Sequence, residues 1–442
     1  DSITANGDPT AGSQTISLAG ARTLTWPDSI KWNGGSAPTL HSYSTPNEAN
    51  VIKLLTRDEG VTWYGWEDVS FVGGYELFGF GNYISGQLGA NDGENHSSPI
   101  QVAGSTWKSL SRNNMMPHQL AMRTDNTMWA WGQNADGRLG LNSINTPTSN
   151  GISSPTQVPG LTWSGKFATG GEASLSTKTD GTLWSWGYNM KGQLGHNQVE
   201  ATYISSPTQV GSDTTWGTDP YGIWLNYDAS TFVVKTDGTL WAWGGNWMGQ
   251  LGQNNRGTPT RRSSPVQIPG STWRSVAGGR RSTIATKTDG TLWAWGYSDN
   301  YGQLGVNNKT DYSSPVQVPG TTWDKLHSGY WHNCAVKTDG TLWTWGPNQY
   351  GTLGLNDRTA RSSPTQVPGT NWYDVAGNYW ATIATKTDGT LWSWGLANGE
   401  GGLGLNQASI SISSPTQIPG TWGTNLGNLT GLYFGFAAIK NP

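Results

Sequence analysis

The sequence has little of three things that many folded proteins use: cysteine, charge and long apolar runs. Cys334 is the only cysteine among 442 residues, so no disulfide forms within the chain and the redox compartment stays open. Charged residues make up 12% of the chain, about half the usual share. The formal net charge of -3 gives no general attraction to nucleic acid or to an anionic membrane. The longest nearly apolar run, Leu432 to Ile439, is far too short to cross a bilayer.

Sequence motifs of common enzymes are missing as well. The chain contains no Gly-Lys-Ser phosphate loop, no Gly-x-Ser-x-Gly nucleophile elbow and no His-Glu-x-x-His zinc helix. It begins at Asp1 without a methionine or a stretch like a signal peptide, as expected of a fragment or a processed form. We therefore expect a protein that is not an enzyme and that uses no cofactor.

Glycine and tryptophan are abundant, and both recur in a repeat. The chain has 62 glycines and 27 tryptophans. A Trp-x-Trp-Gly element ends at Gly132, Gly187, Gly244, Gly296, Gly346 and Gly395, and a degenerate copy, residues 77–81, precedes them. A Ser-Ser-Pro element occurs in the same register at Pro99, Pro155, Pro207, Pro265, Pro315, Pro364 and Pro415. Two independent markers about fifty residues apart predict an array of seven units.

Each unit is predicted to contain four strands, as the unit from residue 273 to 318 shows. Its strands are expected at residues 273–277, 283–287, 291–295 and 315–318, with Pro315 at the start of the last, where a missing N–H is least harmful. Side chains two residues apart point the same way on a strand, so Trp293 and Trp295 are expected to share a buried face that packs against small residues of a neighbouring unit. The same holds for the pairs Trp184 and Trp186, Trp241 and Trp243, Trp343 and Trp345, and Trp392 and Trp394.

Four-stranded units repeated around an axis close into a propeller, and seven is a usual number of blades. The C-terminal stretch 431–440 supplies two strands that should precede a Trp-x-Trp-Gly strand, and residues 75–81 supply the missing one. Such a clasp removes open sheet edges. The predicted architecture is all-β: a seven-bladed β-propeller of four-stranded blades over residues 71–442, closed by an N-/C-terminal clasp and preceded by a small β-rich module at residues 1–70.

The repeat resembles that of the regulator of chromosome condensation family. In that family Asp-Gly, an aromatic-x-Trp-Gly element and Asn-x-x-Gly-Gln-Leu-Gly follow one another, and here they appear as residues 180–181, 184–187 and 189–195. The resemblance implies the fold but leaves function open, because such propellers serve as exchange factors, scaffolds and recognition platforms. A position that the family often fills with histidine is histidine here only at His118 and His332, which favours a structural role.

The region before the repeats has its own resemblance. Residues 24–40 together with residues 60–65 are similar to a small β module of bacteriophage tail-fibre and related virion proteins. This resemblance implies a fibre-type or attachment module. A homo-oligomer formed through this module is one of the partners considered, and the oligomeric state stays open. The alternative is an ordinary β-rich leader without a special role.

Two groups of side chains resemble a metal site and a set of catalytic carboxylates. His327, His332 and Cys334 are close enough in sequence to suggest metal ligands, but Cys334 aligns with Ile284 of another unit, which favours a buried structural position and no metal site. Carboxylates recur in turns at Asp180, Asp237, Asp289, Asp339 and Asp388. Turn acceptors explain them all, because catalysis needs unlike groups that converge on one place.

The two faces of the predicted ring differ. The lower face carries nearly identical Thr-Asp-Gly and Pro-Gly turns, whereas the upper loops vary, which is what a recognition surface on a rigid frame requires. The upper residues predicted to bind a partner are Tyr330, Trp331, Tyr379, Trp380, Arg280, Arg281 and Trp247. The alternative is that the aromatics pack within their own loops. The arginines belong to a basic run of the sequence that also includes Arg256, Arg261, Arg262 and Arg274.

Together these features predict a non-enzymatic bacteriophage virion protein, either a tail fibre, an appendage or a capsid decoration. Its partners would be other virion proteins or a host-surface glycan or protein, its location the virion, and neither nucleic acid binding nor membrane insertion is expected. One alternative is a cellular guanine-nucleotide exchange or chromatin-associated propeller scaffold, although no basic N-terminal arm is present. A second alternative is a secreted bacterial carbohydrate-binding protein.

Overall fold

The chain divides into two compact units, residues 1–75 and 76–441. This computed structural model describes the backbone of residues 13–19, 30–32, 49–56 and 63–67, and residues 75–440 except 114, 145–150, 199–202, 218 and 424–428. The first unit contains a sheet in the order β1 (Ser13–Ala19), β3 (Ala49–Thr56), β4 (Trp63–Glu67), β2 (Ile30–Trp32). Most of the segment that resembles tail-fibre modules lies outside the described residues, so that resemblance stays a prediction.

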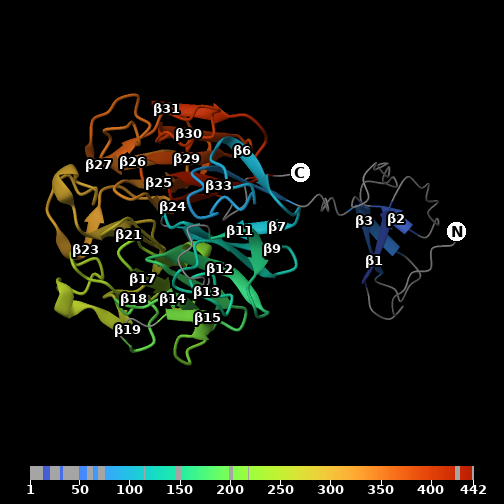
Figure 1. Ribbon diagram of the computed structural model, residues 1–442, viewed down its shortest axis with the longest axis horizontal. Helices are drawn as coiled ribbons and strands as arrows, with labels where there is room; N and C mark the ends of the chain where they lie inside the picture. Colours follow the sequence, from blue (N-terminus) through green and yellow to red (C-terminus); the bar gives the residue numbers. More distant parts are fainter. Residues whose placement is uncertain are drawn as a thin grey trace. The chain divides into compact units, whose positions relative to one another are not determined.

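The second unit is a closed ring of seven four-stranded antiparallel blades (Figure 1), as the sequence predicted. Blade 1 consists of β32 (Leu429–Leu432), β33 (Gly435–Lys440), β5 (Glu76–Gly81) and β6 (His96–Val102), and blade 2 of β7 (Trp107–Leu110), β9 (His118–Arg123), β10 (Met128–Gly132) and β11 (Ile152–Gln157). Blade 3 consists of β12 (Trp163–Gly170), β13 (Ala173–Lys178), β14 (Leu183–Tyr188) and β15 (Tyr203–Gln209), and blade 4 of β16 (Ile223–Leu225), β17 (Ser230–Val234), β18 (Leu240–Gly244) and β19 (Arg262–Gln267). Blade 5 consists of β20 (Trp273–Gly278), β21 (Ser282–Lys287), β22 (Leu292–Gly296) and β23 (Tyr312–Val318). Blade 6 consists of β24 (Trp323–Ser328), β25 (Asn333–Lys337), β26 (Leu342–Gly346) and β27 (Arg361–Gln366), and blade 7 of β28 (Trp372–Gly377), β29 (Ala381–Lys386), β30 (Leu391–Leu396) and β31 (Ser411–Ile418).

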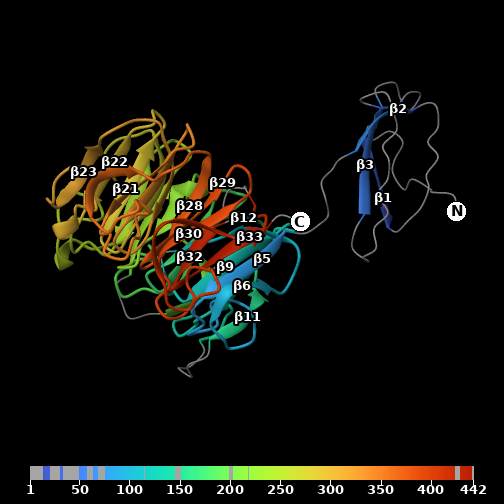
Figure 2. The same cartoon turned by 90° about the horizontal axis from the view of Figure 1, so that it is seen from above.

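The clasp that the sequence predicted is present in blade 1. β33 from the C-terminal region pairs antiparallel with β5 from the N-terminal side of the ring, with Phe436 opposite Phe80. Figure 2 shows β33 and β5 side by side. Because the two ends of the propeller complete one sheet, the inner edge of β5 is paired and the ring is closed.

The first strand of each blade lies nearest the axis, where it contacts the first strands of neighbouring blades. A short strand, β8 (Arg112–Asn113), follows the inner strand of blade 2 and pairs in parallel with β12 of blade 3. Three short 3-10 helices, at Pro220–Gly222, Thr258–Thr260 and Asp299–Tyr301, lie in connections within the described residues. No helix in the described part of the chain is long and apolar enough to cross a membrane.

The second tryptophan of each pair joins neighbouring blades. Trp295 is fully buried, and its indole Nε1 donates a hydrogen bond of 2.7 Å to the carbonyl oxygen of Gln250 in blade 4. A Cβ at Gly252 would lie 3.0 Å from that same nitrogen, so the small residue that receives the large one is a glycine of the preceding loop. The same link is made by Trp131, Trp186, Trp243, Trp345 and Trp394.

The first tryptophan of each pair is less buried than the sequence predicted. Trp293 is only half-buried, because it lies at the lower end of its strand, where Lys287 Nζ sits 4.7 Å from its ring centroid. Its Nε1 donates to Thr291 Oγ1, which in turn donates to Asp289. The turn aspartates are therefore acceptors that cap these indoles. The half-buried partners in the other predicted pairs are Trp184, Trp241, Trp343 and Trp392.

The predicted position of the Ser-Ser-Pro prolines is also wrong. β23 begins at Tyr312, three residues before Pro315. Its ladder with β22 shifts register between the pair Ala294 and Val316 and the pair Gly296 and Tyr312. Pro315 therefore lies in an irregular stretch of an outermost strand, where no neighbouring strand requires its N–H.

The serines before those prolines join neighbouring blades by hydrogen bonds at the outer rim. Ser314 Oγ donates to the side-chain oxygen of Asn254 in the preceding blade, and the N–H of Asn254 donates to the carbonyl of Ser313. Asn254 has a φ of 56°, a left-handed conformation that asparagine tolerates better than most residues. The other six joints use Ser98 with Asn406, Ser153 with Asn91, Ser206 with Asn142, Ser264 with Asn197, Ser363 with Asn307, and Ser414 with Asn356.

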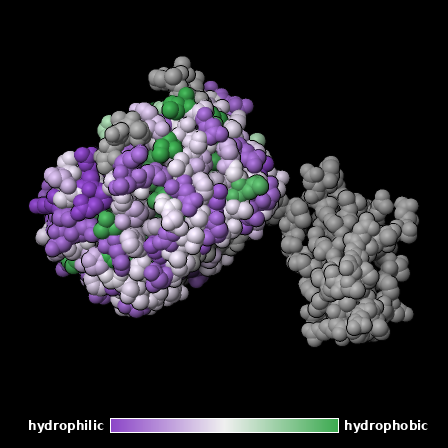
Figure 3. Space-filling view, turned by 90° about the horizontal axis from the view of Figure 1, so that it is seen from below, coloured by the Kyte–Doolittle hydropathy of each residue, from purple (hydrophilic) through white to green (hydrophobic). Residues whose placement is uncertain are grey.

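The outer surface matches the low hydropathy of the sequence. The face in Figure 3 is mainly hydrophilic or intermediate, and apolar residues appear on it as separate spots. The core therefore lies within and between the blades, where the indoles and the short aliphatic side chains are buried.

Candidate recognition site on the upper face

Aromatic side chains from the upper loops of four blades meet near the axis. We call them the aromatic cluster: Tyr227, Tyr330, Trp331, Tyr350, Tyr379, Trp380, Tyr433 and Phe434. At its centre Tyr330 and Tyr379 stack with ring centroids 4.0 Å apart and planes 23° apart. Trp331 packs edge-on against Tyr330, and Trp380 packs edge-on against Tyr379. The structure thus brings together the four aromatic residues that the sequence predicted as a binding surface.

The cluster is partly buried and partly exposed. Tyr330 has only 4% of its surface exposed, whereas Trp331, Tyr379 and Trp380 are half-buried. Burial and a hydrogen bond with Tyr379 raise the pKa of the Tyr330 phenol, so it stays neutral. Tyr330 is therefore a support that packs within the loops, and the surface available to a partner is offered by the three residues around it.

Tight backbone packing brings these loops together. Gly329 precedes Tyr330, and a Cβ at that position would lie 2.5 Å from the carbonyl oxygen of Asn378 in the next loop. The N–H of Tyr330 donates to that same carbonyl, and the N–H of Arg280 donates to the carbonyl of Tyr330. Loops of three successive blades are thus hydrogen-bonded to one another, which fixes the rings they carry.

Arg280 and Arg281 lie at the edge of the aromatic cluster. The guanidinium of Arg280 is 5.4 Å from the ring centroid of Tyr330 and 5.5 Å from that of Trp331. Arg281 Nε donates to Asp228 Oδ2 at 2.5 Å, and Arg280 Nε lies 3.7 Å from the other oxygen of the same carboxylate. The two arginines predicted from the sequence to bind a partner are thus partly balanced by Asp228, which no sequence pattern indicated because it lies more than fifty residues away.

The basic run of the sequence does not form one patch. Arg274 pairs with Asp324 at 2.6 Å and Arg256 with Asp311 at 3.4 Å. Trp247, the remaining predicted binding residue, makes no ring contact with the aromatic cluster among the described contacts. Its ring centroid instead lies 4.5 Å from Lys191 Nζ.

A pocket of 380 Å³ opens beside the aromatic cluster and shares Tyr227 and Tyr433 with it. Residues from four blades line this mouth pocket, including Met115, Glu172 and Lys191. Burial lowers the pKa of the Lys191 ammonium, while Asp228 and Glu172 act in the opposite direction. Part of the pocket wall is formed by the repeated Gly-Gln-Leu-Gly loops, but lining residues such as Gln133 and Lys191 occupy positions that vary between copies, so no sequence pattern marked the pocket.

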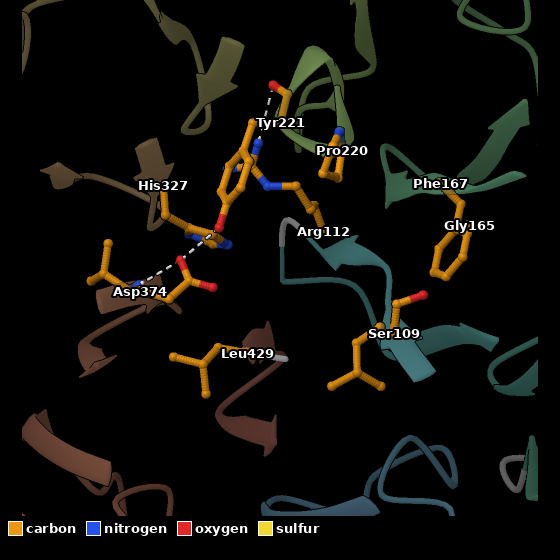
Figure 4. Close-up of a pocket in the computed structure, with 11 residues that line it drawn as sticks. Ser109, Arg112, Gly165, Phe167, Pro220, Tyr221, His327, Asp374 and Leu429 are labelled. Carbon is orange, nitrogen blue, oxygen red and sulfur yellow. Dashed lines mark hydrogen bonds between the residues drawn. The ribbon is translucent and has the colours of Figure 1, made fainter. Parts of the chain in front are cut away.

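Below the mouth, side chains fill the axis of the ring (Figure 4). Arg112 crosses from blade 2, and its Nη1 lies 3.3 Å from the carbonyl oxygens of both Tyr221 and Val276, while Nη2 donates to the carbonyl of Leu326. The Tyr221 hydroxyl donates to Asp374 Oδ1 at 2.9 Å. We call Arg112, Tyr221, His327 and Asp374 the axial cluster.

Burial decides the protonation of the axial cluster. It lowers the pKa of Arg112 to about 10, so the guanidinium stays charged at neutral pH, and it raises the pKa of Asp374. The adjoining cavity holds only about 30 Å³, which is room for a water molecule but not for a substrate. The sequence did contain a signal for the unusual role of Arg112. This residue stands five positions after a repeat tryptophan, and the equivalent positions in two other units are glycines, Gly278 and Gly377.

The histidines and the cysteine that resembled metal ligands make other contacts. His327 Nδ1 accepts a hydrogen bond from the N–H of Gly377, and His332 Nε2 lies 2.9 Å from Thr382 Oγ1 in the next blade. Cys334 is buried, which raises the pKa of its thiol to about 12. Among the residues that the structure describes, no group of three or more potential ligands is arranged to hold a metal.

The fold and this site define a closed seven-bladed propeller built from a tandem repeat, with uniform lower turns and a variable upper mouth. The sequence matches the regulator of chromosome condensation (RCC1) repeat at residues 125–175, 180–216, 237–286, 289–336 and 339–384. These segments cover more than half of the chain, and the chain belongs to this family.

Similar proteins are known from plants, mammals and yeast. The chain is 27% identical over 231 residues to the ultraviolet-B receptor UVR8 of Arabidopsis thaliana. The aligned region covers 51% of this chain and 50% of UVR8. The chain is 26% identical over 241 residues to human E3 ubiquitin-protein ligase HERC2, of which it covers only 5%. Among solved structures, yeast RCC1 (Prp20) bound to Kap60 superposes with a TM-score of 0.69 at 19% identity, covering 84% of this chain and 90% of that one. At that identity the superposition shows the fold alone.

Proposed function

We propose that this protein is a non-catalytic recognition propeller whose aromatic cluster contacts a partner. The observation that carries this proposal is the stack of Tyr330 on Tyr379, which ties the upper loops of adjacent blades into one surface. Aromatic rings supply a large contact area with few rotors to freeze, and they are enriched at the centres of binding interfaces. The cluster offers rings beside Arg280 and Arg281, whose charges Asp228 balances only in part, and no nucleophile stands next to a base within it.

The comparisons support a cellular role for such a surface. The chain belongs to the RCC1 repeat family, and one relative over half of the chain is named as a receptor. This favours the cellular propeller alternative over the virion protein. The bacteriophage role and the virion location rest on residues 24–40 and 60–65, and they stay predictions.

A paired substitution tests the proposal. Trp331→Ala with Trp380→Ala removes two half-buried rings of the aromatic cluster, and Tyr301→Ala removes an exposed ring of another upper loop as a matched control. We expect the double variant to bind its partner from an extract of the native cells about 30-fold more weakly, as when an interface residue contributes about 2 kcal/mol. The control should bind normally.

Circular dichroism and melting curves separate binding from folding. If the double variant loses folding together with binding, the two tryptophans are packing residues and the proposed contact surface is wrong. Undiminished binding by a folded double variant also overturns it.

A further inference from the structure

The mouth pocket has the size and the walls of a small-molecule site. Its 380 Å³ falls within the range of about 300 to 1,000 Å³ that is usual for such sites. Tyr188, Tyr227 and Tyr433 contribute rings from three blades, and Met115 and Met116 of blade 2 contribute apolar surface. The ring centroids of Tyr227, which lines the pocket, and Tyr330 are 4.8 Å apart, so the pocket and the aromatic cluster form one continuous surface.

The charges of the pocket nearly cancel. Asp228 is held by Arg281 and Arg280, and Arg138 donates to Gln133 and to Asp136. Glu172, with 49% of its side chain exposed, lies 3.9 Å from Arg138 Nη2, and Lys191 lies above the ring of Trp247, so the two remaining charges are opposite in sign. A phosphate would meet Glu172 and a quaternary ammonium ion would meet Lys191, so neither a simple anion nor a simple cation is favoured.

The backbone of these upper loops is already paired. At the pocket, the N–H of Tyr188 donates to the carbonyl of Glu172. The N–H of Ile84 donates to Asn82 Oδ1, and the N–H of Lys191 donates to Gln193 Oε1. Extended peptides gain affinity by adding main-chain hydrogen bonds to free backbone groups. Ligand recognition in the pocket must therefore come from side chains, which disfavours an extended peptide.

We infer that the mouth pocket binds the terminal residue of a neutral saccharide. A pyranose ring presents an apolar C–H face, which suits the tyrosine rings, and hydroxyl groups that both donate and accept, which suit Gln133, Glu172 and Lys191. The following sugar residues would pass over Tyr433 onto the aromatic cluster. This inference rests on the proposed function, because it names the chemical class of partner that the same upper face holds.

Ligand-detected NMR and calorimetry on the full chain test the inference. The neutral probes are the methyl glycosides of glucose, galactose, mannose and N-acetylglucosamine, and the charged probes are glucuronic acid, inorganic phosphate and tetramethylammonium. We expect at least one neutral glycoside to bind and no charged probe to compete with it.

Glu172→Gln and Gln133→Ala should each weaken that binding at least tenfold, while Tyr301→Ala leaves it unchanged. Because glutamine has the same shape as glutamate and the Glu172 side chain is half exposed, we expect Glu172→Gln to fold normally. A loss of sugar binding in this variant would then not come from misfolding.

The outcomes separate this inference from the proposed function. If no neutral glycoside binds, or if phosphate or tetramethylammonium binds better, the saccharide site is wrong, whatever the Trp331 and Trp380 variants show. If a glycoside binds but Glu172→Gln and Gln133→Ala do not weaken it, the sugar sits elsewhere and the assignment of the pocket fails. Loss of partner binding in the double tryptophan variant without any glycoside binding leaves the proposed function standing alone.

Discussion

At the scale of single residues, the two tryptophans of each pair look equivalent in sequence but occupy different surroundings. Trp295 fits against Gly252 and donates to the Gln250 carbonyl of the preceding blade. Trp293 remains half-buried beneath Lys287 and donates only to its own turn. The repeat spacing gives the shared face of the two rings, but only the neighbouring blade decides which ring is enclosed.

Substitution of each tryptophan by alanine should reveal this difference as unequal losses in the free energy of unfolding. Trp295→Ala opens a cavity between two blades and breaks an inter-blade hydrogen bond, so we expect it to lower the free energy of unfolding by roughly 3 to 5 kcal/mol. Trp293→Ala should cost about 1 to 2 kcal/mol, because a half-buried ring loses less surface and Lys287 is able to settle into the gap. Urea denaturation measures both. Equal losses would contradict the assignment of Trp295 as the inter-blade link.

Histidine burial predicts a loss of stability in mild acid. Burial lowers the pKa of His332 to about 3, whereas an unfolded histidine titrates near 6.5. Between those pH values the unfolded chain binds the additional proton, so the free energy of unfolding falls as the pH decreases, by about 1.4 kcal/mol per pH unit for each such residue. His118 and His327 are shifted in the same direction.

His332→Gln should flatten this dependence. The glutamine amide still reaches Thr382 Oγ1 but does not titrate, so the slope of stability against pH between pH 6 and pH 5 should decrease by about 1.4 kcal/mol per unit. Urea denaturation across that range measures the slope, with His96→Gln, a substitution of a more exposed histidine, as the control. An unchanged slope would show that His332 is protonated in the folded state as readily as in the unfolded state.

At the scale of elements, repetition decides what the sequence could predict. Strand number, blade number and the clasp followed from markers that recur in one register, and the neighbouring positions of Tyr330 and Tyr379 followed from equivalent loops. The place of Pro315 within its strand did not, because the bulge depends on pairing across an outer edge. Asp228, Arg112 and the mouth pocket did not either, because their contacts join different blades through residues that vary between copies of the repeat.

Removal of the C-terminal strands tests the clasp. Deleting residues 429–442 takes away β32 and β33 and leaves β5 with an unpaired edge toward the axis. We expect a lower melting temperature and concentration-dependent association through that edge. A shorter truncation that removes only residues 441–442 is the control. A long truncation that melts like the wild type and stays monomeric would show that blade 1 does not close the ring.

At the scale of the whole molecule, seven inner strands meet along one axis, and polar side chains cross it. Arg112 of blade 2 reaches carbonyl groups of blades 4, 5 and 6, and Tyr221 of blade 4 reaches Asp374 of blade 7. Ser-Asn pairs join only adjacent blades at the rim. The axial cluster therefore couples blades that do not touch each other through their sheets.

Substitution of Arg112 tests that coupling. Arg112→Met keeps much of the apolar stem but leaves three backbone carbonyls and Asp374 without the guanidinium, so we expect a loss of about 3 to 5 kcal/mol in the free energy of unfolding. Arg358→Met, on an exposed arginine, is the control and should stay within about 0.5 kcal/mol. Amide hydrogen exchange should then accelerate together in the 3-10 helix Pro220–Gly222, β20 and β24, because one side chain contacts backbone carbonyls of all three. If the Arg112 variant is as stable as the control, apolar packing alone holds the axis. If exchange rises only in blade 2, the guanidinium does not couple the distant blades.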